Sequence, residues 1–330
     1  MTHEHLTVEI HPSQFPEPVR LRLERALASR RLPARFLYDS PAQAARWLGY
    51  HAAWSPSRTE SALLALYAER FESTLASMPP SIAYVGLGCG GGTKDALFVR
   101  RALDAGRTLR PTVSDTSPSL VMQALLRLGE LEPGSGGGRV DGPGDRARGL
   151  VIDLEVEPER SAFTDDRPTV WTAFGMVPNL EAEAFLSWAA GVIGPEDRLL
   201  VSANLHPSPF PSAGADILPQ YDNPEARAWY AGAVAELGLN GAELSITGRS
   251  RREDGRAWRV EVCARAGEAA TLRAFDAEVP LEAGEALSVF FSNRYTPDAF
   301  EDELAAAGLT VVDRSIFDGG EEGIWTVRRR

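Results

Sequence analysis

Residues 85–94 read VGLGCGGGTK, with five glycines between a short apolar run and a segment of helical periodicity. The apolar run, residues 81–87 (SIAYVGL), is rich in β-branched and aromatic residues and predicts a buried strand. Thr93 is expected to cap a helix that ends at Ala105, with Gly106 following it. Glycines at such a turn let the backbone approach a ligand closely, and the helix N-terminus favours a carboxylate or phosphate.

Strands and helices alternate outward from this turn. Strand alternating with helix predicts an α/β fold with a parallel, doubly wound sheet. The expected helices cover residues 60–77, 118–128 and 180–193, and the expected strands cover 109–114, 150–154, 168–174 and 198–205.

The pattern changes after Pro207. A helix over 224–237 is followed by runs that alternate like antiparallel strands, over 242–247, 257–264 and 270–279, and then by a helix over 297–307 and strands over 309–316 and 323–327. A chain of 330 residues suggests one large or two interlocked domains. Residues 132–145 contain six glycines and predict a surface insertion, with a functional lid as the alternative.

Composition excludes several classes of protein. An apolar fraction of 44% allows a sizeable core, and a formal charge of −12 gives no electrostatic footprint for nucleic acid. No apolar run is long enough to span a bilayer and the N-terminus has no signal-peptide order, so a cytoplasmic protein is expected. Two distant cysteines and five scattered histidines predict neither a disulfide framework nor a metal site.

The glycine spacing alone does not identify a cofactor. Gly86, Gly88 and Gly91 satisfy the dinucleotide-binding G-x-G-x-x-G pattern, whereas Gly86, Gly88 and Gly90 satisfy G-x-G-x-G equally well. A P-loop is excluded because Lys94 follows Thr93 and precedes Asp95.

Two carboxylates at strand ends favour S-adenosylmethionine over NAD. Asp115 follows the second expected strand, where an acid accepts hydrogen bonds from both ribose hydroxyls, and Asp153 follows the third, where an acid accepts from an adenine amino group. A cofactor without phosphates also agrees with the absence of basic residues around the loop other than Lys94, the only lysine in the chain.

The chain resembles the histidine-specific, S-adenosylmethionine-dependent methyltransferases, typified by the histidine-methylating enzyme of ergothioneine biosynthesis. No single segment is diagnostic, but the order and spacing of several are specific. These segments are FLYDS (36–40), SPSRTE (55–60), GCGGGTK (88–94), VSDTS (113–117), GLVIDL (149–154), GMVPNL (175–180), QYDN (220–223) and GEALSVFFSNRY (284–295).

The resemblance implies a Rossmann-like class I methyltransferase core with a smaller α+β substrate-binding domain. The core would comprise residues 60–205 and 296–330, and the substrate-binding domain residues 1–59 and 206–295. The cofactor-binding residues that it implies are Gly88, Gly90, Lys94, Asp115, Asp153 and Leu154, with Lys94 pairing with the carboxylate of the cofactor's methionine part.

The resemblance also implies an acceptor site. Asn179 and Tyr221 match the residues that grip the α-amino and carboxylate groups of an amino acid in the family. Tyr38, Ser55, Phe290 and Ser292 complete the implied site. Taken alone, Asn179 reads equally as a helix N-cap before Leu180, and Tyr38 and Tyr221 read equally as core tyrosines.

Two departures from the family pattern affect the substrate. Ser55 stands where the family has a tyrosine, and Phe290 stands where it has the glutamate that reads the histidine imidazole. A phenylalanine cannot accept an imidazole N–H, and loss of such a charge-assisted bond typically costs about 1.5–3 kcal/mol. Histidine is therefore not the expected substrate, and an acceptor with an apolar or aromatic side chain would suit Phe290 and Phe291 better.

The sequence thus predicts an S-adenosylmethionine-dependent N-methyltransferase for an amino acid or amino-acid-like small molecule, of the kind used in natural product biosynthesis. Methyltransferases acting on a guanidine, a hydroxyl or a peptide N-terminus remain alternatives. A protein that binds the cofactor without catalysis is a third possibility, because a fold does not fix a function.

Overall fold

The computed structural model describes residues 7–55, 61–131, 136–141, 147–206, 212–251, 254–274 and 276–330. Within these ranges the largest element is a nine-stranded sheet with the path β1-β5-β3-β2-β6-β7-β14-β13, and β4 pairs beside β3. Its strands are β1 (Val8–Ile10), β2 (Ser81–Leu87), β3 (Thr108–Asp115), β4 (Arg139–Val140), β5 (Arg148–Val151), β6 (Thr169–Ala173), β7 (Arg198–Asn204), β13 (Leu309–Ile316) and β14 (Glu322–Arg329).

The strand directions give the fold class. Strands β1 to β7 pair in parallel, whereas β14 runs antiparallel to both β7 and β13. The chain is therefore an α/β protein with a Rossmann-like, doubly wound sheet, as the alternation of strands and helices predicts.

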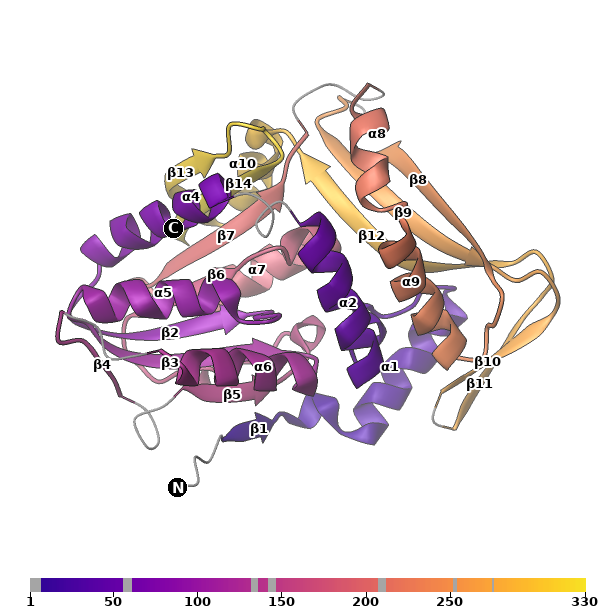
Figure 1. Cartoon of the computed structure of the whole chain (residues 1–330), viewed down its shortest axis with the longest axis horizontal. Coiled ribbons are helices and arrows are strands. Elements are labelled where there is room, and N and C mark those ends of the chain that lie inside the picture. Colours follow the sequence, from indigo (N-terminus) through magenta and orange to yellow (C-terminus); the bar gives the residue numbers. More distant parts are fainter. Residues whose placement is uncertain are drawn as a thin grey trace.

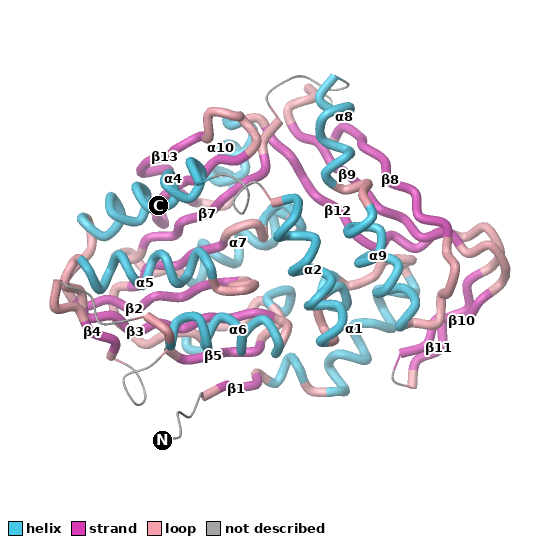
Figure 2. The backbone as a smooth tube through the Cα atoms, in the orientation of Figure 1, coloured by secondary structure: helices cyan, strands magenta, loops and turns pink. Residues whose placement is uncertain are grey.

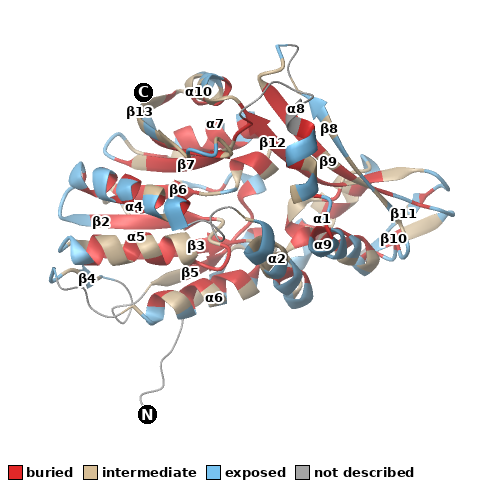
Figure 3. Ribbon diagram, turned by 45° about the horizontal axis from the view of Figure 1, so that its top comes forward, coloured by how far each residue is buried: buried red, intermediate tan, exposed pale blue. Residues whose placement is uncertain are grey.

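Helices cover both faces of this sheet (Figure 1). On one face α4 (Ser61–Ala76), α5 (Thr93–Asp104) and α6 (Pro118–Gly129) pack over strand residues such as Tyr84, whose ring stacks on Phe98 at 4.5 Å. On the other face α7 (Ala182–Val192) and α10 (Pro297–Ala306) pack over the alternate strand residues, among them Val85. Figure 3 shows that the buried residues lie mainly on the strands and on the helix surfaces that face them.

A smaller α+β part stands beside the carboxyl ends of the parallel strands (Figure 2). Its three-stranded antiparallel sheet has the order β12-β9-β8, and β10 and β11 form a separate hairpin. The elements of this part are α1 (Pro16–Ala28), α2 (Pro41–Trp54), α8 (Ser212–Ile217), α9 (Pro224–Glu236), β8 (Glu243–Ser250), β9 (Ala257–Arg265), β10 (Ala270–Ala274), β11 (Ala277–Leu281) and β12 (Ala286–Tyr295).

In the described part of the chain, six short 3-10 helices connect these elements. They cover Pro12–Gln14, Ala34–Leu37, Leu154–Val156, Arg160–Ala162, Val177–Asn179 and Leu218–Gln220. The smaller part has its own cluster of buried apolar side chains, which joins Leu23 of α1, Trp229 of α9 and Val262 of β9. The division of the chain into two domains stays a prediction, and β1 from the N-terminal segment lies in the large sheet beside β5.

Several expected boundaries are wrong. The N-cap of α5 is Gly92, in a left-handed conformation with φ +72°, and Thr93 is the first helical residue. Helix α7 is capped by Glu181, so Asn179 does not cap it. The strand expected over 270–279 is the β10–β11 hairpin. Most of the glycine-rich segment 132–145, with its alternative as a lid, lies outside the described residues.

Candidate functional site

Three neighbouring parallel strands end at one edge of the large sheet. Strand β2 leads into the glycine-rich turn, β3 ends at Asp115, and β5 is followed by Asp153. In doubly wound sheets this carboxyl edge is where ligands bind. The strand order β5-β3-β2 therefore brings the predicted cofactor residues together.

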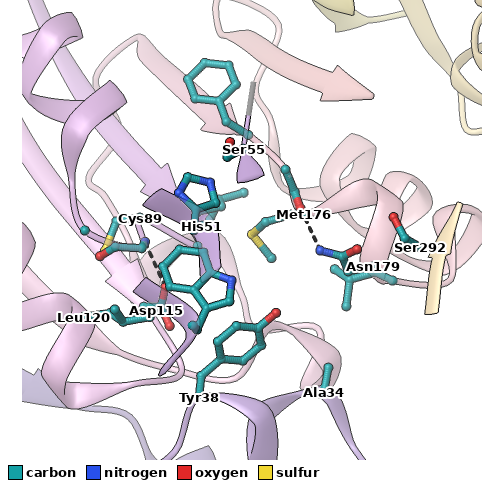
Figure 4. A pocket seen from close by; sticks show the side chains of 18 of the residues that line it. Ala34, Tyr38, His51, Ser55, Cys89, Asp115, Leu120, Met176, Asn179 and Ser292 are labelled. Carbon is teal, nitrogen blue, oxygen red and sulfur yellow. Dashed lines mark hydrogen bonds between the residues drawn. The ribbon is translucent and has the colours of Figure 1, made fainter. Parts of the chain in front are cut away.

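A cavity of about 280 Å³ lies at this edge, between the large sheet and the smaller part. With the exception of Phe291, the residues that the sequence assigns to the cofactor or acceptor site line it: Gly88, Gly90, Lys94, Asp115, Asp153, Leu154, Tyr38, Ser55, Asn179, Tyr221, Phe290 and Ser292. Figure 4 shows Asp115 and Leu120 on one side of the cavity, Asn179 and Ser292 on the other, and Met176 between them.

The glycine-rich turn approaches its neighbours too closely for side chains. Gly88 has φ +62°, and a Cβ there would lie 2.1 Å from the sulfur of Met176. Gly90 has φ +53°, and a Cβ there would lie 2.8 Å from the ring of Trp47 in α2. The turn thus leaves backbone exposed to the cavity, and α2 packs directly against it.

Asp115 is held at the base of the turn. It is buried, and its carboxylate accepts hydrogen bonds from the amide N–H groups of Gly90 at 3.1 Å and Ser117 at 3.0 Å. Burial raises the pKa of Asp115 to about 6, and these backbone hydrogen bonds oppose the rise. At neutral pH the group is an acceptor-only carboxylate fixed in position.

Asp153 lies at the next strand end and is already paired. Its Oδ1 accepts from the amide N–H of Glu155 at 2.9 Å, and its Oδ2 lies 2.5 Å from Nη2 of Arg22 in α1. Leu154 follows it in the 3-10 helix Leu154–Val156, beyond the end of β5. The sequence contains no sign of the Arg22 partner, because α1 precedes β5 by more than a hundred residues.

Lys94 lines the cavity from the first turn of α5. Its Nζ donates to the hydroxyl of Tyr67 at 2.9 Å and lies 3.5 Å from the carboxylate of Glu322. The Tyr67 hydroxyl in turn donates to Glu322. Glu322 begins β14, whose antiparallel direction brings its first residue to the carboxyl edge of the parallel strands. Lys94 therefore has an acidic neighbour that sequence analysis missed.

Two residues expected at the acceptor site, Tyr221 and Ser292, are hydrogen-bonded to each other at the other end of the cavity. The hydroxyl of Tyr221 donates to Oγ of Ser292 at 2.9 Å, and Nδ2 of Asn204 donates to the same oxygen at 3.2 Å. Nδ2 of Asn179 donates to the carbonyl of Gly175 at 3.1 Å. Ser55, the C-cap residue of α2, also lines the cavity.

Aromatic side chains enclose this end of the cavity. Phe290 packs against Tyr221, Trp229 and Tyr230, with ring centroids 6.3, 5.4 and 5.6 Å away. Tyr38 packs against Trp229 at 5.5 Å, and burial raises the pKa of its hydroxyl well above the ordinary value. The acceptor end is therefore an aromatic chamber with a few polar groups.

Helix α2 supplies part of this chamber, and sequence analysis missed it. Trp47, Tyr50, His51 and Trp54 line the cavity at the spacing of one helical face. That spacing is visible in the sequence and indicates an aromatic helix face, but it does not distinguish a face buried in the core from one that faces a ligand.

Phe291 does not belong to the site, contrary to the expectation that it would face the acceptor. Successive residues of a strand point to opposite faces of the sheet. Phe291 lies beneath the guanidinium groups of Arg259 at 3.9 Å and Arg31 at 5.1 Å, away from the cavity lining.

Acidic groups outnumber basic ones around the cavity. Among the described residues, the six lining carboxylates are Asp95, Asp115, Asp153, Glu155, Glu321 and Glu322, and the lysine and arginine side chains are Arg35, Lys94 and Arg294. Across the described ranges, no cluster of histidine, cysteine and acidic residues could hold a metal ion. No helix in those ranges is both long and apolar enough for a membrane span.

Comparison with known proteins gives neither a matching family model nor a matching curated relative. Similar solved structures include Burkholderia thailandensis 1,6-didemethyltoxoflavin-N1-methyltransferase, at 14% identity and TM-score 0.45 over 88% of this chain and 92% of that one. The glycopeptide N-methyltransferase MtfA has 14% identity and TM-score 0.39 over 80% and 92%. The mitomycin 7-O-methyltransferase MmcR has 15% identity and TM-score 0.41 over 94% and 67%.

Proposed function

We propose that this protein is an S-adenosylmethionine-dependent N-methyltransferase whose acceptor is an amino acid or amino-acid-like small molecule other than histidine. One observation carries the proposal. A single cavity runs from the glycine-rich turn and two strand-end carboxylates to an aromatic chamber that contains hydrogen-bonding groups.

The chemistry of the lining fits this cofactor. Asp115 would accept from the ribose hydroxyls, and Asp153 with Leu154 would meet the adenine. Because Gly88 and Gly90 have no side chains, the methionine part of the cofactor could lie against the backbone of the turn. Lys94 would pair with the carboxylate of that methionine part.

The charge of the cavity supports the same choice against NAD. S-adenosylmethionine carries a sulfonium and an ammonium against one carboxylate, whereas NAD carries a pyrophosphate. Among the described lining residues, six carboxylates stand against the three cations of Arg35, Lys94 and Arg294, and this excess attracts a cation and repels a pyrophosphate.

The protein's part in such a reaction is to position the acceptor. When bound, the cofactor would supply an electrophilic methyl group for an amine lone pair, with its own sulfur as the neutral leaving group. Asn179 and Tyr221 would hold the amine and its neighbouring groups in line, which is chiefly a positioning effect. The ammonium proton must leave first, and solvent can take it.

Phe290 argues against histidine as the acceptor. Its ring lies among Tyr221, Trp229 and Tyr230, so no carboxylate stands at this position to accept an imidazole N–H. An apolar or aromatic side chain would instead bury its surface against these rings, which contributes about 25 cal/mol per Å² of apolar area.

Calorimetry and an acceptor panel test the proposal. The purified protein should bind S-adenosylhomocysteine, and with S-adenosylmethionine it should methylate an apolar or aromatic amino acid faster than histidine. Fast histidine turnover would refute the acceptor assignment. Cofactor binding without turnover of any amine, guanidine, hydroxyl compound or peptide would favour a non-catalytic binding protein.

A Lys94→Met variant tests how the cofactor is held. Loss of a charge-assisted hydrogen bond of about 1.5–3 kcal/mol should weaken S-adenosylhomocysteine binding roughly ten- to a hundred-fold. Binding of methylthioadenosine, which lacks the amino-acid part, should be unchanged and serves as the control. Equal loss for both ligands would show that Lys94 acts on the structure of the turn instead.

A further inference from the structure

Arg294 is a buried cation on the wall of the cavity. It lies on β12, two residues beyond Ser292, and is 3% exposed. Its Nη1 donates to the carbonyl of Leu205 at 2.9 Å, and its Nη2 donates to Oε1 of Gln220 at 2.5 Å. Nη2 also lies 3.5 Å from the hydroxyl of Tyr221.

The three described lysine and arginine side chains of the cavity lining differ in their acidic partners. Arg35 pairs with Asp39 at 2.9 Å, and Lys94 lies 3.5 Å from Glu322. Among the described residues no carboxylate forms an ion pair with Arg294, whose hydrogen-bond partners are all neutral. Its Nε lacks a hydrogen-bond partner among those residues.

Gln220 separates Arg294 from the nearest acid in this network. Its Oε1 accepts from Arg294, while its Nε2 donates to the carboxylate of Glu321 at 3.1 Å. The Gln220 amide thus hydrogen-bonds to both charged groups, which are not in contact with each other. A buried charge without an ionic partner is costly, so the guanidinium is poised for an anion that a ligand brings.

We infer that Arg294 binds a carboxylate of the acceptor, and hence that the acceptor is an amino acid with a free carboxylate. This inference rests on the proposed function and narrows its substrate class, excluding amines and amides that lack the anion. A guanidinium matches a carboxylate in geometry and keeps its charge when buried.

The surroundings of Arg294 agree with such an acceptor. Its guanidinium lies 5.7 Å from the ring centroid of Tyr221, and that ring lies 6.3 Å from the ring of Phe290. A carboxylate at Arg294 therefore leaves the amino acid's side chain near the aromatic wall. Tyr221 would then stand between the carboxylate and the apolar part of the same molecule.

The competing explanation is structural. Arg294 also bonds the Leu205 carbonyl just after β7, where Leu205 forms an isolated bridge to Tyr295, and could serve only to join the two sheets. A structural role would affect all acceptors alike, whereas a carboxylate receptor affects only those with the anion. The experiment must therefore compare matched ligands.

The test uses phenylalanine, its amide and phenethylamine with the full-length protein. Wild-type protein should have a kcat/KM for phenylalanine that is roughly ten- to a hundred-fold higher than for phenylalanine amide or phenethylamine, which lack the carboxylate. Arg294→Gln should abolish that preference by lowering phenylalanine turnover alone, and Arg294→Lys should retain part of it. The inference would be overturned if the wild type had the same kcat/KM for all three acceptors. It would also be overturned if Arg294→Gln lowered kcat/KM equally for all three.

Arg259→Gln is the matched control. Arg259 is a buried arginine of the same small sheet, paired with Glu181 and absent from the cavity lining, so the preference among the three acceptors should persist. Calorimetric titration of the three ligands into protein saturated with S-adenosylhomocysteine gives the same comparison without turnover. If S-adenosylhomocysteine did not bind but phenylalanine bound through Arg294, the proposed function would fail and the carboxylate site would stand.

Discussion

Asp95 and Gly86 share one small space beneath the glycine-rich turn. A Cβ at Gly86 would lie 2.0 Å from Oδ1 of Asp95, so a side chain at position 86 would displace the carboxylate. The Tyr84 hydroxyl donates to this oxygen at 2.9 Å. Burial raises the pKa of Asp95 to about 6, and the bond from Tyr84 opposes the rise.

Replacement of Asp95 by Asn should change how stability depends on pH. The folded-state pKa is raised above the ordinary 3.8, so the folded protein binds the proton more tightly and loses stability as pH rises from about 4 to about 6. A shift of this size corresponds to at most about 3 kcal/mol.

Urea unfolding of both proteins at pH 4.5 and pH 8 measures this effect. The Asn variant should gain stability relative to wild type on going to pH 8. Asp115, with its own pKa of about 6, is present in both proteins, but its charge also raises the pKa of Asp95, so its contribution cancels only in part. An identical pH dependence in the two proteins would mean that Asp95 is not the titrating group.

The sequence predicts the place in the site of some residues but not of others. Asp115 and Lys94 follow from motif and position, because each stands at a strand end or helix start. Glu322 could not be found, since its approach to Lys94 depends on the antiparallel insertion of β14 beside β7. The assignment of Phe291 to the site was an avoidable error, because the alternation of side chains along a strand places it opposite Phe290.

At the scale of elements, the start of α5 is packed directly on α6. A Cβ at Gly92 would lie 2.6 Å from the Cα of Ala124, and Gly92 itself has φ +72°. Contact with backbone cannot be relieved by a rotamer change. The close approach of the two helices therefore depends on glycine at this position.

Gly92→Ala should destabilise the protein by at least about 2 kcal/mol, from left-handed backbone strain of about 1–2 kcal/mol plus the collision. Gly129→Ala is the control, because Gly129 ends α6 and a Cβ added there would have no neighbour within 4 Å, so this variant should gain about 0.4–1 kcal/mol in stability. Denaturant unfolding of the two variants measures both effects. Equal small effects would show that α5 and α6 can separate without cost.

Element type was predictable from sequence where the periodicity was long, as in α4, α6 and α9. Short strands were also predictable where an apolar run stands between turn signals, as in β2, β6 and β7, whereas the helices α1 and α2 were not predicted. The span 270–279 alternates like one strand, yet the chain reverses within it to make β10 and β11. Capping of α5 by Gly92 also escaped prediction, because Thr93 is the usual residue type at a cap.

At the scale of the whole molecule, the cavity joins two parts that pack separately. Helix α2 is bonded to α9 within the smaller part through Gln43, whose side chain donates to the carbonyl of Trp229 at 3.0 Å. Its Trp47 meets the glycine-rich turn of the large sheet at Gly90. A ligand in the cavity would contact both parts at once.

Ligand binding should therefore slow hydrogen exchange in α2. Residues 41–54 should gain protection when S-adenosylhomocysteine is added, since the ligand stabilises the state in which α2 closes the site. The β9 strand, which is absent from the cavity lining, should be unaffected and serves as the internal control. Protection of the glycine-rich turn without any change in α2 would contradict this coupling.

The whole-molecule arrangement was only partly accessible from sequence. Alternation of strands and helices predicts a doubly wound sheet, but strand order depends on long-range pairing that no local pattern encodes. The addition of β1 to the edge beside β5 is one such pairing. The relation of the aromatic chamber to the turn depends on how the two parts pack, which local periodicity does not reveal.

The aromatic chamber is assembled from distant stretches of chain, with Trp47 and Tyr50 in α2 and Trp229 and Phe290 about 180 to 240 residues later. A single recombination crossover between the codons for Tyr50 and Trp229 would join part of one parent's chamber to part of the other's. The two parts of such a chamber would not fit each other. A new acceptor preference acquired by gene exchange would need two coordinated crossovers. Point substitution at a single chamber residue is the shorter evolutionary route.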